Sequence, residues 1–323
     1  MKIGILDNIC ATESKTTCGS KMLENFVSGY DATVIEKLKE SNIKTFEKIN
    51  MSEFGVEEND EIGRTVSNNN VEGIVGSDAD GKLRMTASKN KVIGLKPTFG
   101  LISRSGVITT APSLEQVSII AKDIKTCREL LNIISGYDNR DSCSADVETR
   151  LESAQKDISK IKIGVLGDAK YKGATAVKLN IEEYIIPSHY IIWSSEMSSN
   201  LGRFDGIRYG YRTKNAPGLF DVYKNSRAEG FGKEVKKIMI FGTHFLSVDY
   251  KSKYYDKASK IRTMIKKEIA KQFENFDVII TPVEEKYLKL ANLTGHPSLV
   301  VNNVQLIGKH FEENVLLELG GTI

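Results

Sequence analysis

The segment from Gly76 to Gly100 limits what this chain can fold into. It begins GSDADGKLR, where two glycines frame a short acidic loop and a lysine follows, and it ends GLKPTFG, an apolar run broken by a Lys-Pro turn. Glycine between apolar segments is typical of a connecting loop, and a loop held by a rigid scaffold is a common place for functional side chains. We therefore predict a loop of active-site type held by a β-sheet.

The loop is a near match to the phosphate-binding pattern G-x-x-x-x-G-K-[ST], because Gly76, Gly81 and Lys82 have the required spacing. The last position fails, since Leu83 has no hydroxyl for magnesium. Two aspartates between the glycines also place negative charge where backbone N–H groups would receive a phosphate. Residues 85–91 show no apolar helical stripe, so we do not expect the helix that follows a phosphate loop.

The same loop contains Asp-Ala-Asp-Gly, which is a poor calcium-binding pattern. No glutamate follows at the offset that a calcium loop needs for its bidentate ligand. From the residues alone, we interpret the stretch as an exposed Gly/Asp turn.

Length and composition indicate a globular protein. The chain has 323 residues, 40% hydrophobic and 27% charged, so it can bury a core as one large domain or two smaller ones. The net charge of +3 is too small to argue for nucleic-acid binding by itself. Lysine clusters in 233–237 and 251–267 suit acidic partners, but a solvated helix face is the commoner explanation of such runs.

The four cysteines indicate free thiols. Cys10, Cys18, Cys127 and Cys143 form no C-x-x-C pair and no metal-ligand spacing with the four histidines. This usage predicts a reducing compartment and no metal site. The sequence has no run of about 18 apolar residues and no signal-like start, so we expect neither a membrane span nor secretion.

Hydrophobic periodicity predicts both strands and helices. Apolar runs predict strands at 2–6, 162–166, 277–282, 299–301 and 304–307. Helical spacing predicts helices at 31–41, 250–273 and near 312–319, one from the cap Asp123 to Gly136, and mainly helical structure from Pro187. The acidic, Asn-rich stretch up to Asn70 indicates a polar loop, and polar residues 137–160 indicate a subdomain boundary.

Six long segments resemble one family. They are DNICATESKTTCGSKMLENFVSGYDATVIEKL (7–38), GLKPTFGLISRSGVI (94–108), SLEQV (113–117), LLNIISGYDNRDSCSA (130–145), SSEMSSNLGRFDGIRYGYRTK (194–214) and SRAEGFGKEVKK (226–237). In this order they are similar to the amidase signature family, and within it to the A subunits of glutamyl-tRNA(Gln) amidotransferases. The resemblance implies an α/β fold with a mixed β-sheet core covered by helices, in a single domain over 1–323.

The resemblance also implies that this fold is shortened. A helical region before the first strand and a glycine-serine segment upstream of Gly76 have no counterpart here. A crossover helix after 162–166 is missing, and an insertion beyond Pro282 is contracted. Core faces that these segments would cover are then expected to be open.

Members of this family release ammonia from glutamine with a Ser-cis-Ser-Lys arrangement, in which a lysine and a bridging serine activate a nucleophilic serine. The resemblance puts Leu6 at the lysine and Lys82 at the nucleophile. No Gly-Gly-Ser-Ser-Gly-Gly element supplies the bridging serine, and within 64–75 only Ser67 is a conceivable remnant. We therefore assign no catalytic residue to this chain and expect no glutaminase activity.

Two further groups of positions depart from the family. The oxyanion loop becomes Ala79, Asp80 and Gly81, which adds a charge where backbone donors would receive the oxyanion. At the positions that help to hold glutamine, His189 replaces tyrosine and Ile238 replaces arginine. Loss of an arginine removes the bidentate partner of a carboxylate.

The resemblance implies partners as well. B-type and C-type amidotransferase subunits are expected, with tRNA contacted only indirectly and no membrane. ATP and magnesium would belong to a partner subunit, so the chain has no cofactor of its own. The expected location is intracellular, in the cytoplasm or, in a eukaryote, the mitochondrion.

Four interpretations stay open at this point. The chain is a non-catalytic scaffold related to the family's A subunits, an amidotransferase member that works with free ammonia, a hydrolase that uses Lys82, or a degenerate gene product. The hydrolase is disfavoured, because Asp78 and Asp80 flank Lys82 and favour its charged form, which is not nucleophilic.

Overall fold

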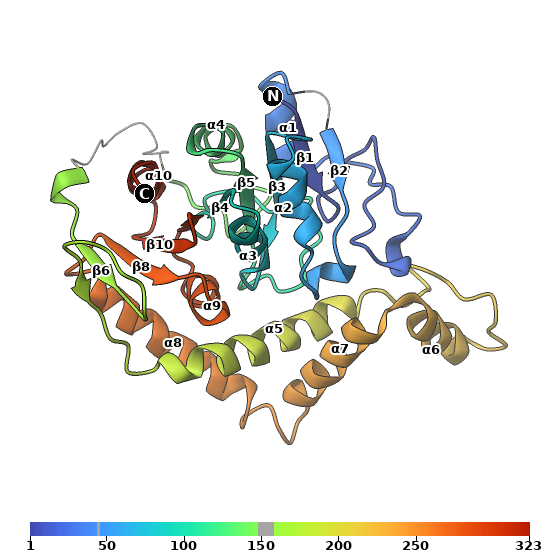
Figure 1. Cartoon of the computed structure of the whole chain (residues 1–323). Coiled ribbons are helices and arrows are strands. Elements are labelled where there is room, and N and C mark those ends of the chain that lie inside the picture. Colours follow the sequence, from blue (N-terminus) through green and yellow to red (C-terminus); the bar gives the residue numbers. More distant parts are fainter. Residues whose placement is uncertain (44–45, 148–157) are drawn as a thin grey trace.

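The described residues, 1–43, 46–147 and 158–323 of a computed structural model, form one ten-stranded mixed sheet with helices on both faces (Figure 1). The strands are β1 (Ile3–Leu6), β2 (Phe46–Ile49), β3 (Gly73–Asp78), β4 (Ile93–Lys96), β5 (Gln116–Ala121), β6 (Ile163–Val165), β7 (Thr175–Ala176), β8 (Val278–Pro282), β9 (Ser298–Val301) and β10 (Val304–Gly308). Their order is β2-β1-β3-β5-β4-β9-β10-β8-β6-β7. Pairing is parallel at both ends of the sheet and antiparallel from β3 through β8.

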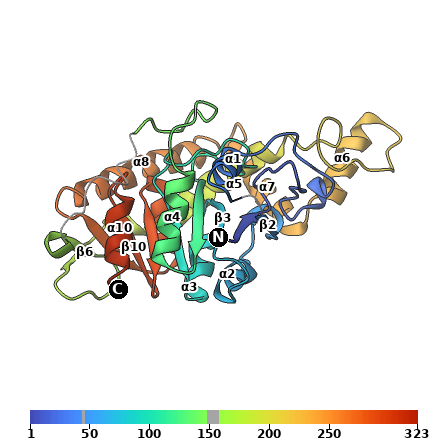
Figure 2. The same ribbon diagram turned by 90° about the horizontal axis from the view of Figure 1, so that it is seen from above.

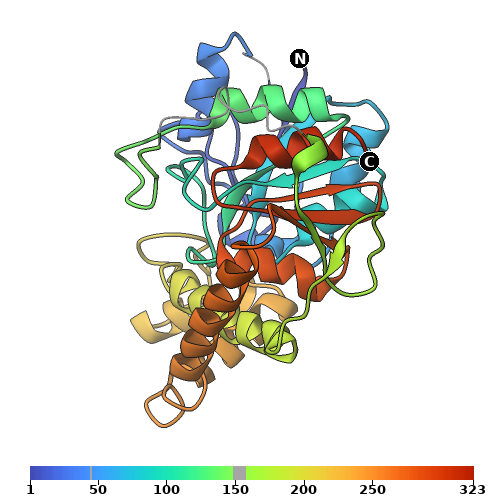
Figure 3. The same cartoon turned by 90° about the vertical axis from the view of Figure 1, so that its left-hand side faces the viewer.

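Helices cover the sheet in two layers. They are α1 (Thr33–Glu40), α2 (Asp60–Ser67), α3 (Lys82–Lys89), α4 (Ile124–Ile134), α5 (Ile185–Leu201), α6 (Leu219–Gly230), α7 (Lys233–Leu246), α8 (Tyr255–Gln272), α9 (Glu285–Thr294) and α10 (Glu313–Gly320). Figure 3 shows α4 and α10 on one face and α5 and α8 on the other. Seen from above in Figure 2, α6 lies at one end of the molecule. The predicted mixed sheet covered by helices is confirmed.

Alternating side chains along the strands build a core on each face of the sheet. In β8, Val278 and Ile280 belong to the core under α1, α4 and α10, whereas Ile279 belongs to the core under α5, α8 and α9. In β10, Leu306 and Ile307 divide in the same way. The sheet is therefore buried on both faces, as near-continuous apolar strands predict.

The helices with a regular apolar stripe lie where periodicity predicts them. The helix predicted at 31–41 is α1, the one at 250–273 is α8, and the one near 312–319 is α10. Asp123 caps α4 as predicted, since its carboxylate accepts a hydrogen bond of 2.7 Å from the backbone N–H of Thr126. From Pro187 the chain is mainly helical, through α5 to α8.

The prediction of a polar loop up to Asn70 is wrong, because α2 occupies Asp60–Ser67. The Asn59 side chain caps this helix by accepting from the backbone N–H of Glu61, 3.1 Å away. Only Ile62 and Val66 carry its apolar contact, one turn apart and both buried. Two apolar residues in a polar stretch are too few to give a periodic signal, and tertiary packing decides the outcome.

The expectation of no helix across 85–91 is also wrong, because α3 spans Lys82–Lys89. Its buried face holds Leu83 and Ala87 together with Arg84 and Thr86. Half of that face is polar, so a search for an apolar stripe misses it. The helix is buried because those polar groups find partners inside the protein.

The predicted subdomain boundary at 137–160 falls partly on residues 148–157, which lie outside the described residues, and it stays a prediction. All four cysteines are free thiols, of which Cys143 is exposed and the others are buried. In the described part of the chain, no helix has the length and apolar character needed to cross a membrane.

Candidate functional site

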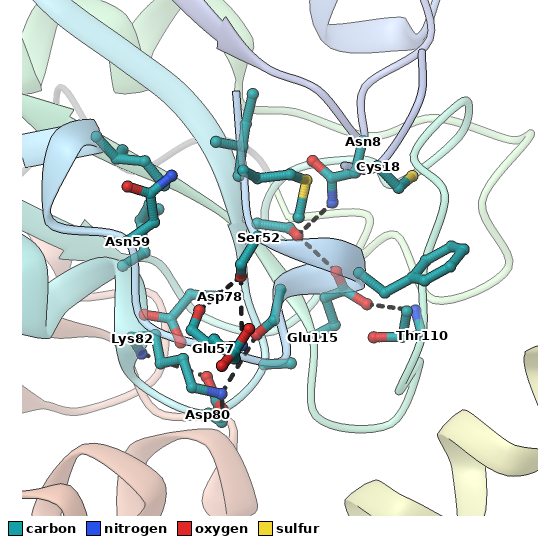
Figure 4. Close-up of a pocket in the computed structure, with 18 of the residues that line it drawn as sticks. Asn8, Cys18, Ser52, Glu57, Asn59, Asp78, Asp80, Lys82, Thr110 and Glu115 are labelled. Carbon is teal, nitrogen blue, oxygen red and sulfur yellow. Dashed lines mark hydrogen bonds and ion pairs between the residues drawn. The ribbon is translucent and has the colours of Figure 1, made fainter. Parts of the chain in front are cut away.

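A small cavity of about 60 Å³ opens where β1 and β3 end and α3 begins (Figure 4). Four residues that the resemblance implies at the family's site line it together: Leu6, Ala79, Asp80 and Lys82. Gly81 lies between them in the same loop. His189 and Ile238 are not among the lining residues. Residues far apart in the sequence are thus brought to one place, as the resemblance implies.

Leu6, at the position of the family's lysine, is the last residue of β1. Its side chain is buried in an apolar cluster with Ile49, Ile74 and Leu83. An aliphatic side chain neither accepts nor donates a proton. The cavity therefore has no base at this point.

The loop from Asp78 to Lys82 uses its own carboxylates to satisfy its backbone donors. Asp78 accepts a hydrogen bond of 2.6 Å from the N–H of Gly81, and Asp80 accepts one of 3.3 Å from the N–H of Lys82. These N–H groups are at the start of α3, where the helix dipole favours negative charge. Carboxylates thus lie where an oxyanion would need free donors. The predicted exposed turn is wrong, because Asp78 and Asp80 are only 2% and 8% exposed.

Gly81 is required by the shape of this loop. Its φ of +91° lies in the left-handed region, and a Cβ there would come within 2.4 Å of the Leu288 Cβ in α9. Glycine alone fits both restrictions without strain. The loop therefore packs directly against α9.

A buried ion pair between Arg84 and Asp78 holds the loop in place. Arg84 donates from Nε to Asp78 Oδ2 over 2.9 Å and from Nη1 to Gln305 Oε1 over 2.8 Å. Asn292 donates to the backbone oxygen of Asp78 over 3.0 Å. Burial raises the pKa of Asp78, but the charge and hydrogen bonds of Arg84 outweigh burial and hold that pKa below its ordinary value. Sequence reasoning missed this role of Arg84.

Lys82, at the position of the nucleophilic serine, is bound on three sides. Its ammonium pairs with the Asp80 carboxylate, donates to the backbone oxygen of Gly55 over 3.3 Å and lies 5.0 Å from the ring centre of Trp193. All three are contacts that an ammonium group makes. A charged amine has no lone pair for attack on a carbonyl.

A second polar chain crosses the cavity, and sequence reasoning missed it. Asn8 donates to the Ser77 hydroxyl over 2.6 Å, and that hydroxyl donates to the Glu115 carboxyl, which also accepts from the N–H of Thr110 over 2.9 Å. Figure 4 shows this contact between Glu115 and Thr110 beside the pair of Asp80 and Lys82. Burial raises the pKa of Glu115 despite these hydrogen bonds. The signal available in the sequence was the pair of motifs Asp7-Asn8 and SLEQV, which the resemblance includes.

The two predicted remnants of the glutamine site have structural contacts instead. His189 in α5 is fully buried, and its Nε2 lies 2.9 Å from the backbone oxygen of Ala79. Burial, with the charge of Lys289, lowers the pKa of His189 to about 3, so the neutral ring donates from Nε2 and supports the loop. Ile238 in α7 is buried in the apolar core under α5.

Within the described ranges, no serine takes the place of the bridging residue. Ser67, the conceivable remnant, ends α2 and donates to the backbone oxygen of Arg64, away from the cavity lining. Ser52 and Ser77 do line the cavity. Ser52 donates to the backbone oxygen of Glu57 over 2.6 Å, and Ser77 is held by its two polar neighbours. Neither hydroxyl has a histidine or lysine beside it as a base among the hydrogen bonds of the described residues.

The cavity can bind polar groups, but among the hydrogen bonds of the described residues no serine that lines it has a lysine or histidine attached as a base. Among the residues that the structure describes, no three histidines, cysteines, aspartates or glutamates are grouped so that they could hold a metal ion.

Comparison with known proteins gives one consistent family. The Amidase family model matches residues 1–70, 62–181 and 170–308. The A subunit of glutamyl-tRNA(Gln) amidotransferase from Bacillus licheniformis is 39% identical over 392 aligned positions, which cover 98% of this chain and 81% of that protein. The protein of the same name from Clostridium novyi is 36% identical, with 98% and 81% covered.

The alignment with the Bacillus relative is longer than this chain. The Bacillus alignment has 392 positions and this chain 323 residues, so at least 69 of the positions are empty in this chain. The three pieces of the family match join at 62–70 and 170–181. The first overlap contains Ser67, and the second follows the predicted strand 162–166.

Solved structures share the fold. The A subunit of glutamyl-tRNA(Gln) amidotransferase from Thermotoga maritima superimposes with a TM-score of 0.73 at 26% identity, covering 99% of this chain and 82% of that one. A peptide amidase from Stenotrophomonas maltophilia gives a TM-score of 0.75 at 17% identity, covering 99% and 81%, which shows a likeness of fold alone.

Proposed function

The chain belongs to the amidase family, and from that premise we propose that it serves as an A-type subunit of a glutamyl-tRNA(Gln) amidotransferase without releasing ammonia from glutamine itself. Its relatives named as A subunits match it over nearly its whole length. In this proposal the chain has the scaffold role of these relatives but not their glutamine chemistry.

One observation carries the loss of chemistry: Leu6 and Lys82 line the same cavity. The family needs a proton acceptor at the first position and a hydroxyl at the second, and this chain has a hydrocarbon and an amine bound to Asp80. Members of a nucleophilic unit act together, so loss of one already removes most of the rate. Here the bridging serine has no counterpart either.

Retention of the loop supports a structural use of the same region. The pair of Asp78 and Arg84, the contact of Gly81 with α9 and the hydrogen bond from His189 to Ala79 hold the loop rigidly. Breaking the pair of Asp78 and Arg84 would leave a buried charge without a partner, so the loop contributes to the stability of the scaffold. We therefore propose that the scaffold is maintained for assembly.

Partner subunits of the B and C types are part of this proposal. Large apolar side chains are exposed on α6 and α7, where Leu219, Phe220 and Ile240 are 71%, 74% and 70% exposed. Exposed apolar side chains gathered on neighbouring elements are typical of protein interfaces. In the amidation step, ATP and magnesium would be bound by a partner, ammonia would come from solution, and tRNA would contact this chain only indirectly.

The experiment combines this chain with B-type and C-type subunits from the same source. Size exclusion reports whether a complex forms, and amidation of Glu-tRNA(Gln) is measured with glutamine or with ammonium chloride as the nitrogen source. We expect a complex that amidates with ammonium and not with glutamine. Amidation with glutamine, or no complex at all, would overturn the proposal.

The interface is tested with one substitution and a matched control. Phe220→Asp places a charge on α6 and should prevent or weaken the complex, by about tenfold or more if this residue is central to the interface. Tyr137→Asp changes another large exposed side chain, 55% exposed and far along the chain from α6, and should leave assembly unchanged. If the two variants form the complex equally well, α6 is not part of the interface.

A further inference from the structure

An open cleft of about 820 Å³ lies between one face of α8 and the loops that follow β4, α9 and β10. It shares no lining residue with the cavity of the candidate site. On the α8 side, Arg262, Lys266 and Ala270 line it at intervals of four residues, so they lie on one stripe of the helix. On the opposite side are Arg104 and His296.

The cleft is strongly cationic. Arg104, Arg262 and Lys266 line it, and none of the described residues that line it is an aspartate or glutamate. Arg104 has a carboxylate partner, Asp141, 3.4 Å away. In the described part of the chain, no ion pair involves Arg262 or Lys266. Lys266 therefore faces the cleft without a paired carboxylate, one helical turn from Arg262, on which the charge of Glu196 also acts.

Arg262 is held in place before any ligand arrives. It donates from Nε to the backbone oxygen of Leu293 over 2.8 Å and from Nη1 to the Ser113 hydroxyl over 2.7 Å. A third hydrogen bond goes from Nη2 to the backbone oxygen of Ser113 over 2.6 Å. A guanidinium has five N–H donors, so two stay available on a group whose orientation is already fixed.

His296 adds an unpartnered buried polar atom to the same cleft. The residue is 5% exposed, and its Nδ1 has no hydrogen-bond partner among the described residues. Its ring stacks on Phe273 with ring centres 4.8 Å apart and on the exposed His310 with centres 3.9 Å apart. Burial lowers the pKa of His296 to about 2, so the ring is neutral. A buried polar atom without a partner is uncommon unless a ligand or water supplies one.

We propose that this cleft binds a small phosphorylated molecule, with its phosphate between Arg262 and Lys266 and its remaining part toward His296 and His310. A phosphate carries enough charge to match both cations and enough oxygens to accept from both. The cleft lies within the size range of small-molecule sites, and the stacked imidazoles offer a flat surface to a ring. Binding at this cleft does not depend on the glutamine chemistry of the candidate site.

Calorimetric titration of the purified chain with AMP and with inorganic phosphate tests the proposal, with adenosine as the uncharged counterpart. We expect saturable binding of AMP at one site, weaker binding of phosphate and none of adenosine. Lys266→Gln removes one charged contact from an exposed position and should weaken AMP binding by about tenfold or more. Lys266→Arg should restore most of the affinity.

Lys267→Gln is the matched control, because Lys267 is exposed on the same helix and does not line the cleft. It should leave AMP binding unchanged. Absence of saturable binding by AMP and phosphate, or equal loss in the Lys266 and Lys267 variants, would overturn the proposal. Binding of a short RNA but not of AMP would also overturn it, because the cleft would then recognise a nucleic-acid backbone.

Discussion

Lys82, the first residue of α3, pairs with Asp80 in the preceding loop, and its ammonium also donates to the backbone oxygen of Gly55 over 3.3 Å. The position at which the family resemblance places a nucleophile thus holds a cation bound to its neighbour. The pair lies in the cavity lined by Leu6. Residues from distant points of the sequence therefore meet in one place, at positions to which the family resemblance assigns two different parts of the same reaction.

Restoring two family residues should not restore the reaction. We expect the double variant Leu6→Lys with Lys82→Ser to release no ammonia from glutamine, because the bridging serine still has no counterpart and the parts of such a unit are not additive. The measurement is ammonia release by protein whose fold is checked by circular dichroism. Turnover by this variant would show that another hydroxyl, with Ser77 the first to test, completes the unit.

Breaking the buried ion pair should destabilise the protein strongly. Asp78→Asn leaves Arg84 charged and buried, and we expect a loss of about 3 to 5 kcal/mol in the free energy of unfolding. Lys89→Gln removes the exposed pair with Glu58 and should cost less than about 1 kcal/mol. Urea unfolding measures both. Similar losses would contradict the view that the pair anchors the loop.

Substitutions at two glycines distinguish the cost of backbone strain from the cost of close packing. Gly81→Ala must adopt a left-handed φ and also meet Leu288, whereas Gly173 has a φ of +81° with no atom within 4 Å of an added Cβ. We expect Gly173→Ala to cost about 1 kcal/mol from strain alone. Gly81→Ala should cost about 3 kcal/mol, because overpacking adds to strain. Equal losses in the free energy of unfolding, measured thermally or in urea, would show that contact with α9 is not the reason for glycine at position 81.

Asp138 should make stability depend on pH on the acidic side. Burial raises its pKa, but hydrogen bonds from Ser103, Thr33 and Arg140 outweigh burial and hold that pKa well below its ordinary value. The resulting stability is complete above the ordinary aspartate pKa of about 3.9 and is lost as the pH falls through the lowered value.

Asp138→Asn should therefore be less stable than the unchanged protein near neutral pH. The difference in stability between the two proteins should become smaller below about pH 4. Urea midpoints measured along the acidic range check this. Asp249→Asn, at an exposed position, serves as the control and should follow the unchanged protein. A stability difference that stays constant with pH would contradict a stabilising charge on Asp138.

The parts of the fold that the sequence predicts are those with local signals. Apolar spacing and the Asp123 cap predict α4, and a short apolar run predicts β8. The helices α2 and α3 escape prediction because their buried faces are short or half polar. Their stability comes from residues elsewhere in the chain, which no local window contains.

The candidate site shows the same division. The family resemblance places Leu6 and Lys82 at one site, and the structure brings them to one cavity. Local sequence could not predict that Arg84 would meet Gln305, 221 residues later, or that His189 would support the loop through the backbone of Ala79. Such contacts depend on which strands and helices become neighbours, so they follow from the tertiary fold.

The most direct test of the central claim is ammonia release from glutamine by the purified chain, alone and combined with B-type and C-type subunits. An amidotransferase that has the lysine and both serines serves as the positive control. We predict release no faster than in the absence of protein, because Leu6 and Lys82 stand where the family resemblance places the lysine and the nucleophilic serine. Release above that background, proportional to the amount of this chain, would contradict the account.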